Sequence, residues 1–284
     1  MCIRQIARFL LLALPLAALR ALQASADEPQ VSGPEVEAAR KFQAYAKETA
    51  AAYDARAEKQ DGRKLTLRDE PILRWSNPLG GHKAHGEVFL WTDNGRPAAV
   101  LSMYEYTATD GVVHEHHEFC SLARGGLHFA SPRPLIWAPA EAGIELKLVP
   151  DAPAPAASAR QRLPQMRDLA ARFTAEKTTR QDETRDLRLL SQPVYRYEGL
   201  DAKEGDALDG ALFAFVEATD PEVFLLLEAR ETGGKPAWHY AAARMNSVRL
   251  AVALGDVPVW EADVLPWRDA LNRRDRPYTA FQVR

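Results

Sequence analysis

An Asn-Gly pair between two long apolar stretches constrains the fold of this chain more than any other feature. Asn94 and Gly95 separate residues 87–91 from residues 98–106. Both residue types accept positive φ angles, so the pair is typical of the tight turn of a β-hairpin. A second turn sequence, at residues 109–111, precedes another apolar stretch. The sequence therefore predicts an antiparallel meander of at least three strands.

A helix is expected before this meander. Apolar residues recur at steps of three and four between Val36 and Ala57, which predicts a helix of about six turns with one apolar face. Ser32 and Glu35 fit a capping box at its start, and Gly62 is expected near its end. We expect the apolar face of this helix to pack on the sheet.

The second part of the chain repeats the same order. Residues 150–163 are rich in Pro and Ala, which is typical of a linker. Helical spacing resumes at Pro164, and further strand-like stretches follow. The predicted fold class is α+β with two similar halves, residues 27–149 and residues 164–284. Each half is expected to be a helix packed on an antiparallel β-meander.

Short stretches of the two halves also align with each other. Residues 86–91 align without gaps on residues 210–215, and Pro97 then falls on Pro221. An internal duplication would explain this match. Any two hairpins with a proline at the turn also resemble each other, so the alignment leaves both interpretations open.

The start of the chain, residues 1–26, has the pattern of a secretory signal peptide. Arg4 precedes an apolar run at residues 9–19, and Ala24 and Ala26 fit the small-x-small cleavage pattern. The run is shorter than the roughly 20 residues that span a bilayer. The sequence thus predicts a secreted or periplasmic protein with no transmembrane segment after signal cleavage. An uncleaved N-terminal anchor is the alternative.

Composition narrows the function classes. The chain has 284 residues, of which 46% are hydrophobic, so it is long enough for one large domain or two smaller ones. Its net charge of −3 provides no basic stripe, so nucleic acid is not expected as a partner. Signal cleavage would remove Cys2 and leave Cys120 in an apolar stretch. We therefore expect a buried, unreactive thiol and no disulfide.

The most conspicuous polar motif is the run His114-Glu115-His116-His117-Glu118. Side chains alternate along a strand, so His114, His116 and Glu118 share one face, while Glu115 and His117 share the other. Two imidazoles and a carboxylate are ligands that suit Zn²⁺ or Cu²⁺. The sequence therefore predicts a metal site at His114, His116 and Glu118. A solvated strand face without function is the alternative.

The surroundings of this motif add further expectations. A symmetric turn would place His116 opposite Ser102 on the neighbouring strand, and His82 and His85 could supply further metal ligands. The chain contains no Gly-x-Ser-x-Gly nucleophile motif and no phosphate-binding loop. We therefore predict no catalytic residues and no cofactor other than the alternative metal.

Residues 189–197, 209–215 and 219–222 resemble an uncharacterised family of secreted bacterial proteins. The resemblance covers most of residues 65–262 and implies no activity, so no functional residue follows from it. The order of a helix and then an antiparallel meander also resembles cystatin-like and nuclear-transport-factor-like folds. That similarity concerns architecture only, and a fold does not determine a function.

These observations favour an exported, non-catalytic binding or interaction protein. Its partner would be an envelope protein or a small ligand. A metal-binding protein or metal-dependent hydrolase that uses the His/Glu motif is the first alternative. A carrier that encloses a small apolar ligand between helix and sheet is the second.

Overall fold

The computed structural model describes most of the chain after residue 32. The described residues are 33–59, 61–77, 84–108, 110–132, 135–198, 207–271 and 273–283. The predicted signal peptide and His82 lie outside them. The chain divides into two compact units, Met1–Ala39 and Arg40–Arg284, and all the sheets belong to the second.

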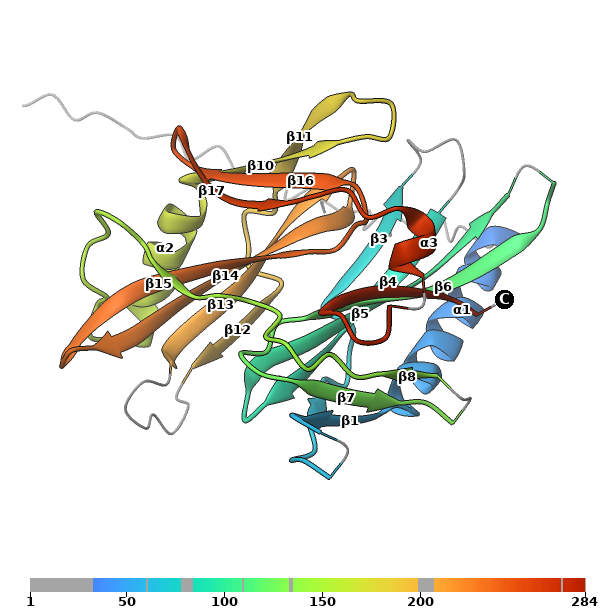
Figure 1. Cartoon of the computed structure of the whole chain (residues 1–284), viewed down its shortest axis with the longest axis horizontal. Helices are drawn as coiled ribbons and strands as arrows, with labels where there is room; N and C mark the ends of the chain where they lie inside the picture. The colour runs from blue at the N-terminus through green and yellow to red at the C-terminus, as the bar shows by residue number, and fades with distance from the viewer. Residues whose placement is uncertain are drawn as a thin grey trace, which may run out of the picture. The chain divides into compact units, whose positions relative to one another are not determined.

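Three antiparallel sheets, of three, six and nine strands, make up most of the second unit (Figure 1). The six-stranded sheet has the order β18-β6-β5-β4-β2, and β3 also pairs with β4. Its strands are β2 (Thr66–Leu67), β3 (Leu73–Asn77), β4 (Ala84–Asp93), β5 (Arg96–Thr107), β6 (Val113–Ser121) and β18 (Tyr278–Gln282). The three-stranded sheet consists of β1 (Asp54–Ala57), β7 (Leu127–Ala130) and β8 (Ile136–Trp137).

The nine-stranded sheet has the order β17-β16-β10-β11-β13-β14-β15-β9, and β12 also pairs with β13. Its strands are β9 (Lys147–Leu148), β10 (Phe173–Thr178), β11 (Thr184–Leu189), β12 (Tyr195–Glu198), β13 (Ala207–Glu217), β14 (Asp220–Thr232), β15 (Lys235–Arg244), β16 (Arg249–Leu254) and β17 (Val257–Ala262). The helices are α1 (Pro34–Ala51), α2 (Ala159–Ala170) and α3 (Trp267–Ala270).

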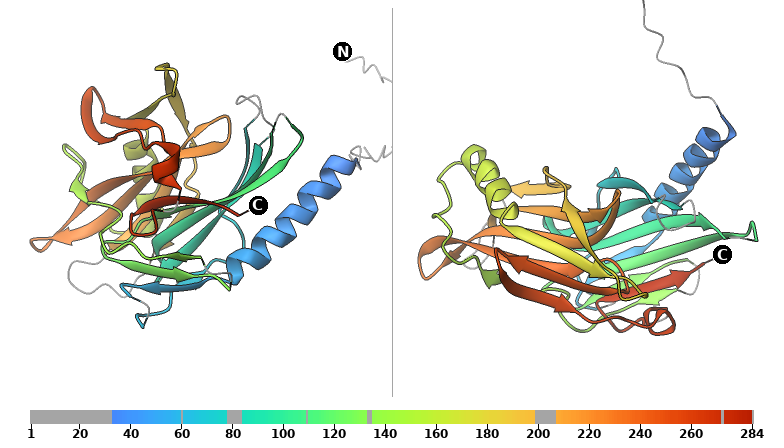
Figure 2. Two further views of the ribbon diagram at one scale, coloured as in Figure 1. Left: turned by 45° about the vertical axis from the view of Figure 1, so that its right-hand side comes forward. Right: turned by 90° about the horizontal axis from the view of Figure 1, so that it is seen from above.

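The six-stranded sheet is covered on both faces. On one face, Phe119 belongs to a hydrophobic core with Phe42 of α1 and Phe129 of the three-stranded sheet. Figure 2 shows the part of α1 that belongs to the second unit, residues 40–51, beside the six-stranded sheet. On the other face, Cys120 belongs to a core with Phe224 of the nine-stranded sheet. Since both faces of the central strands are buried, these strands read as continuous apolar runs without alternation.

The prediction of an α+β fold with two similar halves is wrong. The described residues form a mostly β structure with three helices of 18, 12 and 4 residues. The sheets also disregard the predicted boundary, because C-terminal β18 pairs with β6 and β9 pairs with β15. Local hydrophobic patterns do not report such pairing between distant segments, so the sequence suggested separate halves.

Helix boundaries differ from the prediction as well. Helix α1 ends at Ala51, and β1 follows at Asp54, within the expected helix. The apolar spacing continues through Ala57 because β1 also buries alternate residues. Helix α2 begins at Ala159, inside the range interpreted as a linker, where the Ser158 hydroxyl accepts a bond from the backbone amide of Gln161 at 3.4 Å.

The predicted hairpin is confirmed. Strands β4 and β5 pair antiparallel up to Asp93 and Arg96, and Asn94 and Gly95 between them have φ angles of 49° and 85°. This geometry explains why the turn needs these residue types, since both central positions have positive φ. Among the described helices, none combines the length and the apolar character needed to cross a lipid bilayer.

Two glycines let aromatic rings of neighbouring strands lie against the long hairpins. Gly86 pairs with Trp75, and a Cβ atom at Gly86 would lie 2.7 Å from the Trp75 ring. Gly210 pairs with Tyr197, and a Cβ atom there would lie 2.3 Å from the Tyr197 ring. Any larger residue at either position would force the ring away from the sheet.

Candidate functional site

Strand β6 carries the polar motif and lies between β5 and β18. Because side chains alternate, its even-numbered residues face the nine-stranded sheet and its odd-numbered residues face α1. Cys120 and Phe119 show the two directions, since they belong to different hydrophobic cores. The motif therefore supplies two separate sets of polar groups, one to each side of the six-stranded sheet.

The structure places the predicted metal ligands on the even-numbered face, where each has another partner. His114 is partly exposed, and its Nδ1 lies 3.0 Å from Nε2 of Gln282. His116 is buried and stacks on Tyr104, with ring centroids 5.2 Å apart. Glu118 accepts a hydrogen bond from the hydroxyl of Tyr278.

The register differs from the prediction by two residues. His116 lies opposite Tyr104, and Glu118 lies opposite Ser102. The turn is closed by a bond from the Ala108 amide to the Val112 carbonyl, so its centre lies one residue further along the chain than expected. A shift of two residues keeps the same side chains on the same face, and the predicted faces are therefore correct.

Burial makes the two central groups of this face neutral at neutral pH. It lowers the pKa of His116 to about 4, and the charges of His114 and His117 contribute. It raises the pKa of Glu118 to about 8 despite the bond from Tyr278. Metal binding needs a deprotonated carboxylate, and within the described ranges no three His, Cys, Asp or Glu side chains are grouped to hold a metal ion.

The odd-numbered face holds a continuous chain of four buried or half-buried polar groups. Tyr45 donates to Oε1 of Glu115 at 2.8 Å, and Nε2 of His117 lies 3.0 Å from the same oxygen. The Tyr53 hydroxyl lies 2.7 Å from Nδ1 of His117. We refer to Tyr45, Glu115, His117 and Tyr53 as the β6 relay.

With a neutral His117, the β6 relay has one pattern of donors and acceptors. An ionised Glu115 can only accept, so Nε2 of His117 carries the proton that it donates. Nδ1 of a neutral imidazole is then an acceptor for the Tyr53 hydroxyl. Glu115 therefore fixes both the orientation and the tautomer of His117, and the two tyrosines close the chain at its ends.

A pocket of about 490 Å³ adjoins this relay. It lies between the C-terminal half of α1, the segment after β7 and the end of β18. Three relay members line it, together with apolar and polar neighbours from these elements. The lining residues used below are Tyr45, Thr49, Tyr53, His117, Leu135 and Phe281.

The arrangement can orient a ligand at the wall of the pocket. Both nitrogens of His117 are engaged within the relay, and the relay contains no serine, threonine or cysteine that could act as a nucleophile. Tyr45 and Tyr53 are held by the relay and lie at the wall of the pocket, where they can contact a ligand. A polar group of a ligand can be oriented there while its apolar part lies against Leu135 and Phe281.

Sequence reasoning found half of this relay. Glu115 and His117 were recognised as sharing a face, but no partner for them was predicted. Tyr53 falls within the residues predicted as a helix, and the sequence pattern gives no sign of a role for Tyr45. The available signal was the motif itself, because a buried His and Glu on one face require hydrogen-bond partners from another element.

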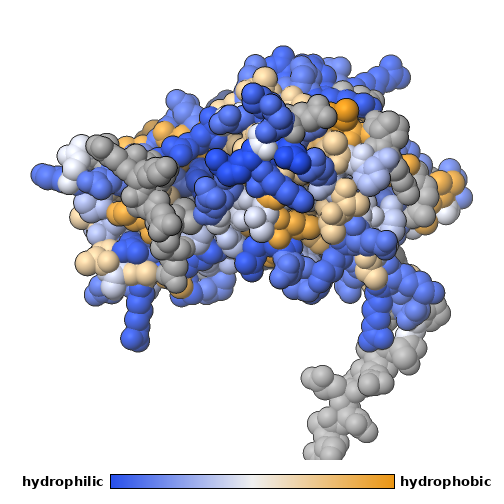
Figure 3. Space-filling model, turned by 90° about the horizontal axis from the view of Figure 1, so that it is seen from below, coloured by the Kyte–Doolittle hydropathy of each residue, from blue (hydrophilic) through white to orange (hydrophobic). Residues whose placement is uncertain are grey.

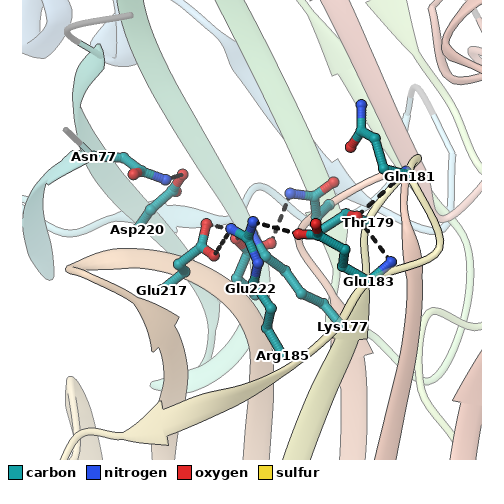
Figure 4. A network of polar contacts seen from close by, with 10 residues as sticks. Asn77, Lys177, Thr179, Gln181, Glu183, Arg185, Glu217, Asp220 and Glu222 are labelled. Atoms are coloured by element: carbon teal, nitrogen blue, oxygen red, sulfur yellow. Dashed lines mark hydrogen bonds and ion pairs between the residues drawn. The ribbon is translucent and has the colours of Figure 1, made fainter. Parts of the chain in front are cut away.

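Another polar cluster lies where the two large sheets pack together (Figure 4). Lys177 donates to Glu217 and to Glu222, both at 2.6 Å, and Asn77 donates to Asp220 at 3.3 Å. Burial is the main cause that raises the pKa of Asp220 and of Glu222. Its hydrogen bonds and ion pairs link β3, β10, β13 and β14, so the cluster has a structural role.

Comparisons with family models, with curated proteins and with solved structures found no match to this chain.

Proposed function

We propose that this chain is an exported binding protein that holds a small ligand in the pocket beside the β6 relay. The observation that carries the proposal is the juxtaposition of a 490 Å³ pocket with an ordered chain of buried hydrogen bonds. Pockets of about 300–1,000 Å³ with a few fixed polar groups are typical of small-molecule sites. The proposed ligand has an apolar body and one hydrogen-bonding group.

The distribution of exposed hydrophobic side chains supports a small ligand as the partner more than another protein. Figure 3 shows one face of the molecule that is mostly hydrophilic, with small separate hydrophobic areas. Large exposed hydrophobic side chains of the described residues come from several different elements and loops: Val112, Val113, Ile136, Leu148, Val257 and Val264. An interaction surface for a protein would gather such side chains into one patch.

Export and duplication are part of the same proposal. Residues 1–26 support export through their signal-like pattern. The two long hairpins support duplication, because Gly86 and Gly210 align in sequence and each accommodates an aromatic ring from the adjacent strand. The β-bulges also correspond, at Trp91 in the first hairpin and at Phe215 in the second.

The experiment that tests the binding site is a fluorescence titration with N-phenylnaphthylamine, a neutral apolar dye. Thr49→Trp would place a large side chain from α1 into the pocket, whereas Ala44→Trp adds the same side chain at an exposed position of the same helix. We expect Thr49→Trp to weaken binding by about tenfold or more and Ala44→Trp to leave it unchanged.

Two results would contradict the proposal. One is an absence of dye binding to the unmodified chain. The other is equal binding by both tryptophan variants, provided that their thermal unfolding shows both to be folded.

A further inference from the structure

A second pocket, of about 380 Å³, lies on the other side of β6. It is formed by the end of β6, by β15 and β17, and by the segment from α3 to β18. Three arginines, one tryptophan and one tyrosine line it, and Asp269 is the acidic residue among them. These lining residues are Arg244, Trp260, Arg273, Arg276 and Tyr278.

The guanidinium of Arg244 is held in place by neutral groups. It donates to the backbone carbonyls of Asn246, Asp263 and Val248 at 2.8, 2.9 and 2.8 Å. Its Cζ also lies 5.1 Å from the centroid of the Tyr278 ring. In the described part of the chain no carboxylate oxygen lies within ion-pair distance of it, so its hydrogen bonds fix its position without balancing its charge.

Two carboxyl groups, Glu118 and Asp263, act on the charge of Arg244 from beyond ion-pair distance. Burial lowers the pKa of Arg244, although Tyr278 and Glu118 act in the opposite direction. A partly buried cation without a counter-ion is unfavourable, and an anion in the pocket would relieve that cost.

The hydrogen-bond count shows which donors of Arg244 are left for a ligand. A guanidinium has five N–H donors, and the three bonds to carbonyls use one each on Nε, Nη1 and Nη2. One donor remains on Nη1 and one on Nη2, and no acceptor among the described residues takes them. An oxyanion in the pocket can accept hydrogen bonds from them.

The other lining residues suit an organic anion. Trp260 and Tyr278 offer flat apolar surfaces. Arg273 and Arg276 are exposed, and the carboxylates of Asp275 and Glu141 lie 3.4 to 3.8 Å from them. They add positive potential near the pocket, which attracts anions.

We propose that this pocket is a binding site for a small aromatic oxyanion, with its acidic group on Arg244 and its ring against Trp260 and Tyr278. The site is independent of the pocket beside the β6 relay. Carboxylates and phosphate esters share the required chemistry, and the test separates them.

The test is calorimetric titration of the full chain with naphthoate, naphthyl phosphate and inorganic phosphate, with neutral naphthamide as the matched control ligand. We expect naphthoate or naphthyl phosphate to bind at least about tenfold more tightly than naphthamide. The stronger of the two identifies the acidic group. Binding of inorganic phosphate alone, or equal binding of naphthoate and naphthamide, would overturn the proposal.

Variants locate the site. Arg244→Gln should weaken binding of the preferred anion by about tenfold or more, whereas Arg249→Gln, an exposed arginine outside the pocket, should not. If Arg244→Gln does not fold, the double variant Arg273→Gln/Arg276→Gln, with both changes on the surface, should still weaken binding several-fold. Thr49→Trp should leave anion binding unchanged. If Arg244→Gln and Arg273→Gln/Arg276→Gln both bind the anion with unchanged affinity, the anion binds elsewhere and the proposal is wrong.

Discussion

The two faces of β6 differ in how their buried carboxyl groups are hydrogen-bonded. On the odd-numbered face, Glu115 has a donor on each side and is compatible with a full charge. On the even-numbered face, Glu118 has one bond, from Tyr278, and takes a proton instead. Glu115 and Glu118 are three positions apart on the same strand. Their different protonation therefore comes from the elements that pack on each face of β6, and not from the motif itself.

This difference explains why the two faces suit different ligands. The relay of the odd-numbered face is held by hydrogen bonds among its own members and can offer an oriented wall to a ligand. On the even-numbered face no carboxylate of the described residues lies at ion-pair distance from Arg244, and the pKa of Glu118 on that face is raised by burial. A polar network that is complete provides rigidity, whereas an incomplete one indicates a place for a partner.

The largest expected effect is the loss of Glu115. In Glu115→Ala the hydroxyl of Tyr45 and Nε2 of His117 both lose their acceptor, and a buried donor without an acceptor is costly. We expect the free energy of unfolding, measured by urea titration, to fall by about 4 kcal/mol. Glu115→Gln, which keeps one acceptor oxygen, should lose about half as much. Equal losses in the two variants would mean that the acceptor oxygen kept by glutamine does not contribute to stability.

The next effect concerns the pH dependence of Glu118. Its pKa is raised by burial from 4.5 to about 8, so between these values the folded chain binds a proton that the unfolded chain has released. The free energy of unfolding therefore falls as pH rises through this window, by about 1.4 kcal/mol per unit. Glu118→Gln removes this contribution and should be about 3 kcal/mol more stable than the unmodified chain at pH 7.

The measurement is a series of urea titrations of both proteins between about pH 5 and pH 8. This range roughly covers the interval between the unfolded and folded pKa values of Glu118. Asp220 and Glu222 also have raised pKa values, so the unmodified chain retains some slope from them. The difference between the two proteins isolates Glu118. Parallel curves would show that Glu118 is ionised in the folded chain, and the two faces of β6 would then be alike.

Much of the local structure could be predicted from the sequence. Asn94 and Gly95 determine their hairpin through backbone angles that few other residues accept. The burial of Cys120 followed from its apolar neighbours and is confirmed. The division of the polar motif into two faces followed from strand geometry alone. Each of these inferences depends on residues that are close together in the chain.

What could not be predicted depends on distant segments. Nothing near β6 indicates that β18 becomes its neighbour or that Tyr278 reaches Glu118. Both faces of the six-stranded sheet are buried, so its central strands are apolar runs without alternation. Such a run does not indicate which residues face α1 and which face the nine-stranded sheet. Tyr53 shows the same limit, since its spacing fits the helix before it although it lies beyond the helix end.

The smallest and most specific effect is a coupling energy. Tyr53 and Glu115 bond to opposite nitrogens of the same imidazole, so changing one alters the tautomer on which the other depends. A double-mutant cycle of Tyr53→Phe with Glu115→Gln should therefore give a coupling of about 1 kcal/mol in urea titrations. The matched cycle of Tyr278→Phe with Glu115→Gln joins residues on opposite faces of β6 and should give a coupling near zero. Coupling of similar size in both cycles would show that the sheet transmits changes from one face to the other, and the two sites could then no longer be treated as independent.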